Sequence, residues 1–173
     1  MRSPITDYLE DVVASCTGDD DSPLSVAVVT VEGTRYGAGD TEVSFPIQSI
    51  SKALTYALAL DDHGLDAVHE KIDVEPSGDA FNEISLEAET GRPRNAIINA
   101  GAIAAHSLVH GADATERADR ILALHSAFVG RELAVDESVV DDEMAGAHRN
   151  LALAHMLASV GVLACDPHEV VEG

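Results

Sequence analysis

A serine and a lysine stand three residues apart in the run 45–54, where a short extended stretch leads into an apolar segment of helical character. Residues at i and i+3 share one helical face, so Ser49 and Lys52 can meet where the predicted helix begins. A serine hydroxyl becomes a good nucleophile when a neighbouring base takes its proton, and a lysine whose pKa is lowered by burial can be that base. The free N–H groups of a first helical turn also favour developing negative charge. The spacing therefore predicts Ser49 as a nucleophile and Lys52 as its general base.

This Ser-x-x-Lys pattern is the arrangement of the penicillin-binding, β-lactamase-like serine hydrolases. The alternative interpretation is a helix-capping serine beside a solvated lysine. Two observations favour the catalytic interpretation: Lys52 is one of only two lysines in the chain, and its neighbours would half-bury it. Those neighbours are apolar: Ile50, Ala53, Leu54, Ala57 and Leu58.

The charge balance excludes several classes of partner. The chain has 173 residues, of which 31 are acidic and 10 basic, for a formal net charge of -21. Nucleic acid and anionic membranes need basic patches on a protein, so neither is expected as a partner. The acids are scattered, which is typical of the solvated surface of a protein from a high-salt cytoplasm, where salt screens self-repulsion. Disorder is the competing interpretation, but 46% of the residues are hydrophobic, so we expect a folded domain.

Location and metal content are also constrained by the sequence. The N-terminus lacks the features of a signal peptide, and the longest apolar stretch, 97–109, is too short to span a membrane. We therefore expect a cytoplasmic protein. Cys16 and Cys165 are isolated thiols without metal-ligand spacing. Five histidines also lack partner ligands at the spacing of a zinc site, so we expect no metal and no cofactor. They are His106, His110, His125, His148 and His155.

Hydrophobic periodicity and turn residues predict the order of the elements. A helix at 4–16 and an acidic loop at 17–23 precede two strands, 24–31 and 35–38, joined by a tight connection at Glu32-Gly33. A third short strand is predicted at 42–45. The serine helix should end near Asp62, with Gly64 as its C-terminal stop. A Pro/Gly turn at 75–82 and a loop at 91–95 separate the other predicted helices, which are 67–71, 96–109, 115–128 and 138–160.

Four sequence blocks carry a more specific resemblance. They are PIQSISK (46–52), EPSGDAFN (75–82), GRPRNAIINAGAI (91–103) and EMAGAHRN (143–150). In this order and at this spacing they resemble the serine-dependent glutaminases of the β-lactamase-like superfamily. The resemblance covers 24–160 and the first half of a full family chain, after a diverged N-terminal helix and acidic loop at 1–23. It implies that 1–173 is a single glutaminase domain, truncated at its C-terminal side.

The resemblance also implies roles for individual residues. Ser49 would be the acyl-accepting nucleophile and Lys52 its base, while Asn99, Glu143 and Asn150 match substrate-binding positions together with Ser49. The implied reaction converts L-glutamine and water to L-glutamate and ammonia through an acyl-serine. An enzyme that selects free glutamine must hold its α-ammonium with a carboxylate and its α-carboxylate with amide donors, which explains the residue types. Glu143 and Asn150 lie at i and i+7, so they share one face if the predicted helix is continuous.

The chain also departs from the family pattern. The family's later tyrosines and its Lys-Ser-Gly strand have no counterpart, and its early Asp-Tyr-Ile-Pro block is absent unless Asp7-Tyr8 is a remnant. The implied fold is α/β, serine β-lactamase-like (DD-peptidase-like): mostly the helical part plus an N-terminal β-hairpin, with the C-terminal strands missing. Two alternatives to a glutaminase stay open, namely another Ser-x-x-Lys amidohydrolase and an inactive or split fragment. We expect a homo-oligomer or a complementing C-terminal chain, docked on apolar faces of 96–109 and 151–160.

Overall fold

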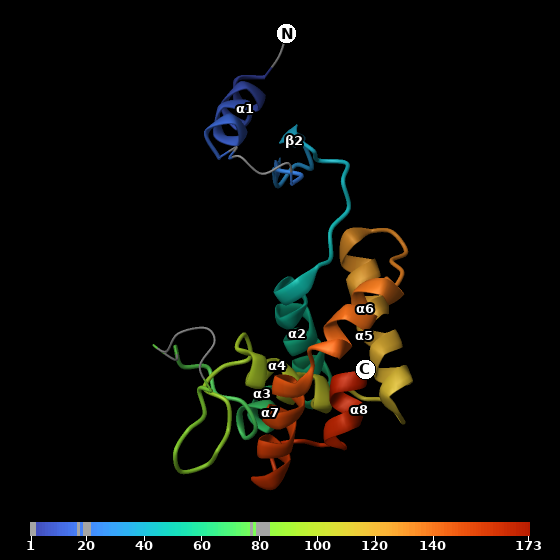
Figure 1. The fold of residues 1–173 in the computed structure, drawn as a ribbon. Helices are drawn as coiled ribbons and strands as arrows, with labels where there is room; N and C mark the ends of the chain where they lie inside the picture. Colours follow the sequence, from blue (N-terminus) through green and yellow to red (C-terminus); the bar gives the residue numbers. More distant parts are fainter. Residues whose placement is uncertain (1–2, 17, 19–21, 77, 79–83) are drawn as a thin grey trace. The chain divides into compact units, whose positions relative to one another are not determined.

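The structure is a computed structural model that describes residues 3–16, 18, 22–76, 78 and 84–173 (Figure 1). The chain forms two units, Met1–Pro46 and Ile47–Gly173. Its secondary structure is mixed α/β and mostly helical, with one small β-hairpin among the described residues, as the sequence predicted. Within the described part of the chain, the helices are too short or too polar to cross a bilayer.

The first unit packs one helix against a β-hairpin. Helix α1 (Pro4–Cys16) buries Leu9 and contacts both strands. Strands β1 (Ser25–Val29) and β2 (Arg35–Gly39) are antiparallel. In the turn between them, the Gly33 amide donates to the carbonyl of Thr30 at 2.9 Å, and Gly33 has a φ of 83°, which glycine adopts without steric cost. The predicted helix and the first two predicted strands are therefore confirmed.

The third predicted strand, at 42–45, is wrong. Gly39 has a φ of 76°, which turns the chain out of the hairpin. The carboxylate of Asp40 then accepts a hydrogen bond from the Leu24 amide at 3.2 Å, and the Val43 amide donates back to the Asp40 carbonyl at 3.0 Å. These bonds form a turn where the apolar pattern predicts a strand. Residues 42–45 are not assigned to a strand in the described structure.

The second unit is helical. Its elements in chain order are η1 (Gln48–Ile50), α2 (Ser51–His63), α3 (Leu65–His69), α4 (Asn99–Leu108), α5 (Ala114–Val129), α6 (Glu137–Ala145), α7 (His148–Ser159) and α8 (Pro167–Glu172). Helix α2 ends at Gly64 as predicted. The sequence pattern missed α8, and the predicted helix at 138–160 is wrong as a continuous element because it is divided into α6 and α7. The turn predicted at 75–82 includes residues 77 and 79–82, which lie outside the described residues.

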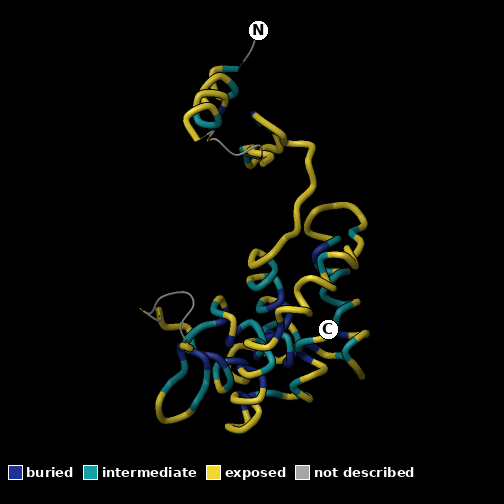
Figure 2. Tube along the Cα trace, viewed as in Figure 1, coloured by how far each residue is buried: buried dark blue, intermediate teal, exposed yellow. Residues whose placement is uncertain are grey.

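The core of this unit lies where α2, α4 and α7 pack together. Figure 2 shows buried stretches gathered there, whereas the connection from α5 to α6 is exposed. The core side chains are small or aliphatic: Ala59, Val68, Ile72, Ala96, Ala100, Ala104, Ala105, Leu108, Leu153, Leu157 and Val162. Segment 96–109 therefore uses most of its apolar side chains inside this unit, whereas 151–160 buries Leu153 and Leu157 but leaves Met156 and Val160 exposed. The expectation that these segments dock a partner stays a prediction.

Two arginines hold connections of the second unit in place. Arg92 donates to Glu87 at 2.7 Å and also to the carbonyl of His69, so it anchors the loop before α4. Arg120 on α5 donates to both carboxylate oxygens of Asp62, at 2.6 and 2.7 Å. These hydrogen bonds lower the pKa of the Asp62 carboxyl to about 2. The C-terminal end of α2 is thus fixed to α5. The N-terminal end of the same helix carries the Ser-x-x-Lys pattern.

Gly101 lies where α4 approaches the backbone that precedes it. A Cβ at this position would lie 1.9 Å from the Asn95 carbonyl oxygen and 2.8 Å from the Cα of Ala96. We expect Gly101→Ala to lower the free energy of unfolding by about 3 kcal/mol or more, because backbone atoms cannot move aside as a side chain can. Urea unfolding followed by circular dichroism in molar KCl measures the change.

Gly146→Ala is the control for this substitution. Its added Cβ would meet only the Glu143 carbonyl oxygen, at an ordinary 3.7 Å, so the unfolding free energy should change by less than about 1 kcal/mol. Similar losses in the two variants would show that the close approach of α4 does not limit stability.

Candidate active site

The chain enters α2 through the 3₁₀ turn η1, so Ser49 lies just before the α-helix rather than within it. Gln48, immediately before the serine, has a φ of 49°, which is a left-handed conformation that non-glycine residues rarely adopt. The Ser51 hydroxyl donates to the Gln48 carbonyl at 2.8 Å and holds this turn. Backbone strain of this kind concentrates at functional sites, and here it sets the direction in which the side chains of Gln48 and Ser49 point.

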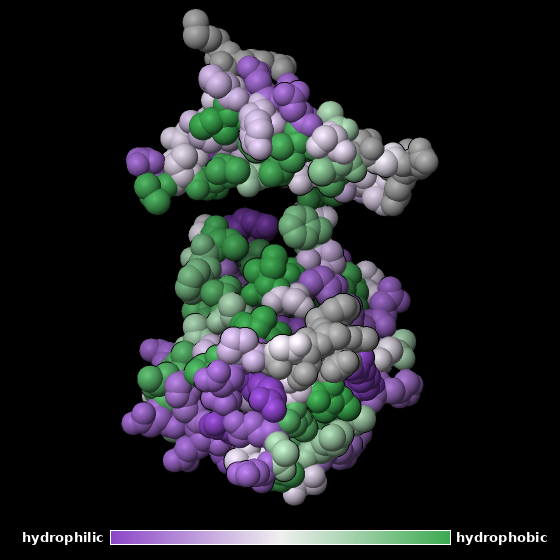
Figure 3. Space-filling view, turned by 90° about the vertical axis from the view of Figure 1, so that its left-hand side faces the viewer, coloured by the Kyte–Doolittle hydropathy of each residue, from purple (hydrophilic) through white to green (hydrophobic). Residues whose placement is uncertain are grey.

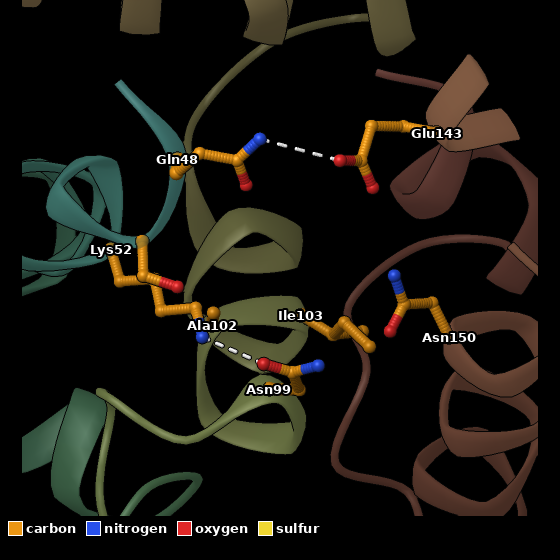
Figure 4. Close-up of a pocket in the computed structure, with 8 residues that line it drawn as sticks. Gln48, Lys52, Asn99, Ala102, Ile103, Glu143 and Asn150 are labelled. Atoms are coloured by element: carbon orange, nitrogen blue, oxygen red, sulfur yellow. Dashed lines mark hydrogen bonds between the residues drawn. The ribbon is translucent and has the colours of Figure 1, made fainter. Parts of the chain in front are cut away.

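All five residues that the sequence predicted for the site line one cavity. The cavity has a volume of about 290 Å³ and receives side chains from η1, α2, α4, α6 and α7 (Figure 4). Its described lining is Gln48, Ser49, Lys52, Asn99, Ala102, Ile103, Glu143 and Asn150. Segments nearly 100 residues apart in the sequence therefore meet around a space that suits a small polar ligand.

Lys52 is the half-buried cation of this cavity. Its Nζ donates to Oδ1 of Asn99 at 2.7 Å, and burial lowers the pKa of its ammonium. A lowered pKa increases the fraction of neutral amine, which is the form that can accept a proton. Among the contacts of the described residues, no hydrogen bond joins Lys52 to Ser49. Ser49 is exposed in the cavity wall, so an incoming carbonyl group can reach its hydroxyl.

Local structure explains why Asn99 faces Lys52. The side-chain oxygen of Asn95 accepts hydrogen bonds from the amides of Ile97 and Ile98, at 3.0 and 3.2 Å, and so forms an Asx turn that leads into α4. Asn99 is then the first residue of α4. Because its Oδ1 accepts from Lys52, its amide Nδ2 stays available to donate to a ligand in the cavity.

Glu143 and Asn150 reach the cavity from two different helices. The expectation of one continuous helix fails at Gly146, where the Gly146 and Ala147 amides bond three residues back, to Glu143 and Met144, and α6 ends. Glycine destabilises a helix interior, which explains the break. Glu143 nevertheless accepts a hydrogen bond from Nε2 of Gln48 at 3.4 Å, and Asn150 lies across the cavity in the first turn of α7 (Figure 4).

The sequence did not single out three residues of the lining: Gln48, Ala102 and Ile103. Gln48 stands inside the PIQSISK block directly before the nucleophile, so its position was a usable signal. Ala102 and Ile103 follow Asn99 at i+3 and i+4 on the same face of α4, which a periodicity argument could have found. No tyrosine is among the described residues that line the cavity.

In the described part of the chain, no group of three or more histidine, cysteine, aspartate or glutamate side chains is placed to hold a metal ion. Burial lowers the pKa of His106 to about 4 and also lowers the pKa of His125. Both imidazoles are therefore neutral near pH 7 and lie inside the protein rather than at its surface.

Comparison with known proteins assigns the family. A family model described as Glutaminase matches residues 10–173. The chain belongs to the glutaminase family. The glutaminase of Corynebacterium efficiens is 42% identical to it, over 99% of this chain and 44% of that protein, and the glutaminase of Corynebacterium glutamicum is 44% identical, over 99% and 42%. This glutaminase-family chain thus spans less than half the length of these relatives.

Solved structures agree with the family assignment. The crystal structure of Mglu in its glutamate form has a TM-score of 0.89 and 45% identity, and the match covers 99% of this chain and 43% of that chain. The probable glutaminase of Bacillus subtilis has a TM-score of 0.84 and 35% identity, with 96% and 54% covered. Mglu has also been crystallised in its native form in the presence of 4.3 M NaCl, with 44% identity and a TM-score of 0.88 over 99% of this chain and 43% of that chain.

Proposed function

We propose that this chain carries the nucleophile and the substrate-binding face of a glutaminase that converts L-glutamine and water to L-glutamate and ammonia. The observation that carries the proposal is the convergence of Ser49, Lys52, Asn99, Glu143 and Asn150 on one cavity. The family assignment supplies the substrate class. The fold of the whole enzyme is then of the serine β-lactamase type, with 1–173 as part of one glutaminase domain.

In the proposed mechanism, Lys52 takes the hydroxyl proton of Ser49 while the serine oxygen attacks the side-chain amide carbon of glutamine. The C–N bond breaks, the proton from Lys52 goes to the departing ammonia, and a glutamyl ester remains on Ser49. Water then attacks this ester while Lys52 accepts its proton. The C–O bond to Ser49 breaks, Lys52 returns the proton to the Ser49 oxygen, and glutamate leaves. The lowered pKa of Lys52 supports its role as the base, because both steps begin with the neutral amine.

Recognition of free glutamine rests on the other side of the cavity. We assign the α-ammonium of the substrate to the carboxylate of Glu143 and its α-carboxylate to the amide donors of Asn150 and Asn99. The Asn99 amide is oriented for this role because its oxygen is occupied by Lys52. The same carboxylate argues against another Ser-x-x-Lys amidohydrolase, since an ester or peptide substrate without a free ammonium would leave Glu143 without a cationic partner.

We also propose that catalysis needs more protein than this chain supplies. A serine–lysine pair without donors for the developing oxyanion loses on the order of 100- to 1,000-fold in rate for each missing donor. The partner would be a homo-oligomer or a complementing chain that carries the remaining length of the relatives. Several large apolar side chains of the second unit are exposed, and they include Ile50, Phe128, Val129 and Val135. Figure 3 shows one face of the molecule, on which apolar patches lie between hydrophilic ones.

The proposed setting is a high-salt cytoplasm, without nucleic acid or membrane as a partner. The net charge of -21 supports it, because such a surface repels polyanions and itself at low ionic strength. Neither a metal nor a cofactor takes part in the proposed reaction.

The test is an assay of glutamate and ammonia release from L-glutamine in molar KCl. The purified chain should show little or no turnover alone, and turnover should appear when a chain carrying the remaining part of a glutaminase relative is added. L-asparagine and glutamine without its α-amino group serve as discriminating substrates, and both should be poor. Robust turnover by the chain alone would contradict the need for a partner. Equal turnover of the substrate without an amino group would favour the broader amidohydrolase.

A further inference from the structure

Two apolar side chains belong to the lining of the otherwise polar cavity beside Ser49. Six of the eight described residues that line it carry polar or charged side chains, and the other two are Ala102 and Ile103. Ala102 offers a single methyl group, so Ile103 is the larger apolar surface. Figure 4 shows Ile103 extending from α4 toward the side of the cavity on which Asn150 lies. An apolar part of a ligand in this cavity therefore finds its described apolar contact mainly at Ile103.

Glutamine has the complementary distribution of polarity. Its α-groups and its side-chain amide are polar, and two methylene groups lie between them. The proposed assignment places the amide carbon at Ser49 and the α-ammonium at Glu143, so the methylenes cross the cavity between these two residues. Methylene groups gain from contact with apolar surface, whereas contact with polar groups displaces the water that those groups bind. The side chain of Ile103 is the surface that suits the methylenes.

Ile103 is held firmly in its position. It follows Asn99 at i+4 on α4, so the two side chains lie on one face of the helix. A β-branched side chain in a helix has one strongly preferred rotamer. Ile103 is also half-buried and packs against the hydrophobic core of the second unit. Its methyl groups therefore form a stiff wall at a fixed place relative to Asn99, which accepts the hydrogen bond from Lys52.

A second cavity makes the size of this wall important. It has a volume of about 200 Å³, and Lys52, Ala102 and Ile103 line both cavities. Lys52 is held by its hydrogen bond to Asn99, and Ala102 cannot be shortened without exposing the helix backbone. The side chain of Ile103 is thus the one whose length can set how far the first cavity extends. A shorter residue at 103 would open the first cavity toward the second.

We propose that Ile103 is a specificity-determining residue, which packs on the two methylenes of glutamine and sets the length of side chain that the cavity accepts. The inference rests on the proposed function, because it concerns the substrate of the same site. Asparagine, with its α-ammonium at Glu143, places one methylene fewer on Ile103. One methylene in an apolar contact discriminates between substrates by roughly 10- to 200-fold. Ile103 touches the substrate in this role but transfers no proton.

The kinetic test shortens Ile103 in steps in an active assembly that contains this chain. KM for L-glutamine should rise about 3-fold in Ile103→Val and about 10-fold in Ile103→Ala, with kcat within about 2-fold, because the contact is the same in the ground state and the transition state. For L-asparagine, kcat/KM should fall by less than about 3-fold in Ile103→Ala, since asparagine makes less of this contact. The preference for glutamine over asparagine therefore decreases as carbons are removed.

Ile98→Val is the matched control. Ile98 is also a half-buried isoleucine that packs against the core of the second unit, but it lines neither cavity. Its substitution should leave the ratio of kcat/KM for the two substrates within about 2-fold of the parent. A general loss of structure would instead lower kcat for both substrates together, so it is distinguishable from a lost contact.

A measurement without turnover uses the chain alone. The δ1 methyl groups of isoleucine are labelled with ¹³C, and the Ile103 signal is identified by its absence in Ile103→Val, since valine has no such methyl. L-Glutamate has the α-groups and the two methylenes of the substrate, and it should shift the Ile103 signal but not the Ile98 signal. L-Aspartate, which is one methylene shorter, should need a concentration at least about 10-fold higher for half of the shift.

The results separate this inference from the proposed function. An unchanged preference for glutamine in the Ile103 variants of an active assembly would overturn the inference. So would an Ile103 methyl signal that L-glutamate does not move, or that L-aspartate moves equally well. If Ile103→Ala does not fold, Ile103→Val carries the kinetic test and the methyl spectra use the parent chain. Missing glutamate release beside an intact L-glutamate shift at Ile103 would count against the proposed function and support the placement of Ile103.

Discussion

In an active assembly that contains this chain, Ser49→Ala and Lys52→Ala should each reduce turnover of L-glutamine by at least about 1,000-fold. Without Ser49 no acyl intermediate can form, and without Lys52 no group of lowered pKa is positioned to take the serine proton. The double variant should be little worse than either single variant, because the two residues act in the same step. Single-turnover and steady-state release of glutamate both measure the effect.

Two substitutions control for general effects on folding and charge. Lys71→Ala removes the other lysine, whose Nζ bonds the Gly161 carbonyl away from the cavity. Ser159→Ala removes an exposed hydroxyl at the end of α7, which donates to the Met156 carbonyl. Both variants should keep turnover within a few-fold of the parent chain. If the losses at Ser49 and Lys52 added up in the double variant, the two residues would not form a nucleophile and its base.

Local sequence signals were sufficient for most of the fold. The helix α1, the hairpin turn at Gly33 and the end of α2 at Gly64 follow from periodicity and from glycines at positive φ. The predicted strand at 42–45 failed because Asp40 redirects the chain through a hydrogen bond to the Leu24 amide, 16 residues away. A local pattern contains no information about such a distant partner.

The candidate site also combines features that the sequence predicts with features that it does not. Ser49 and Lys52 follow from their spacing, and the family blocks pointed to Asn99, Glu143 and Asn150, all of which line the cavity. Their geometry depends on features that sequence spacing does not encode. One is the left-handed Gln48, which aims its side chain at Glu143.

The second feature that sequence spacing does not encode is the break between α6 and α7 at Gly146. Two turns of one straight helix predict that Glu143 and Asn150 share a face, but the residues reach the cavity from separate helices.

Glu143→Gln keeps the shape of the side chain and its hydrogen-bond acceptor for Gln48 but removes the negative charge. We expect KM for L-glutamine to rise by about 100-fold, roughly 2.7 kcal/mol, because the α-ammonium would be desolvated without a counter-charge. For the same substrate without its α-amino group, KM should change by less than about 3-fold. Asp142→Asn is the matched control, since Asp142 is an exposed neighbour on α6 that does not line the cavity.

The comparison of the two substrates separates recognition from a general loss of structure. A distorted cavity would raise KM for both substrates, whereas a missing counter-charge affects only the one that carries an ammonium. The hydrogen bond from Gln48 makes the difference sharper, because a glutamine at 143 can still accept it and hold η1 against α6. Equal effects on both substrates would remove Glu143 from the binding site, and the specificity for free glutamine would then have to come from the partner chain.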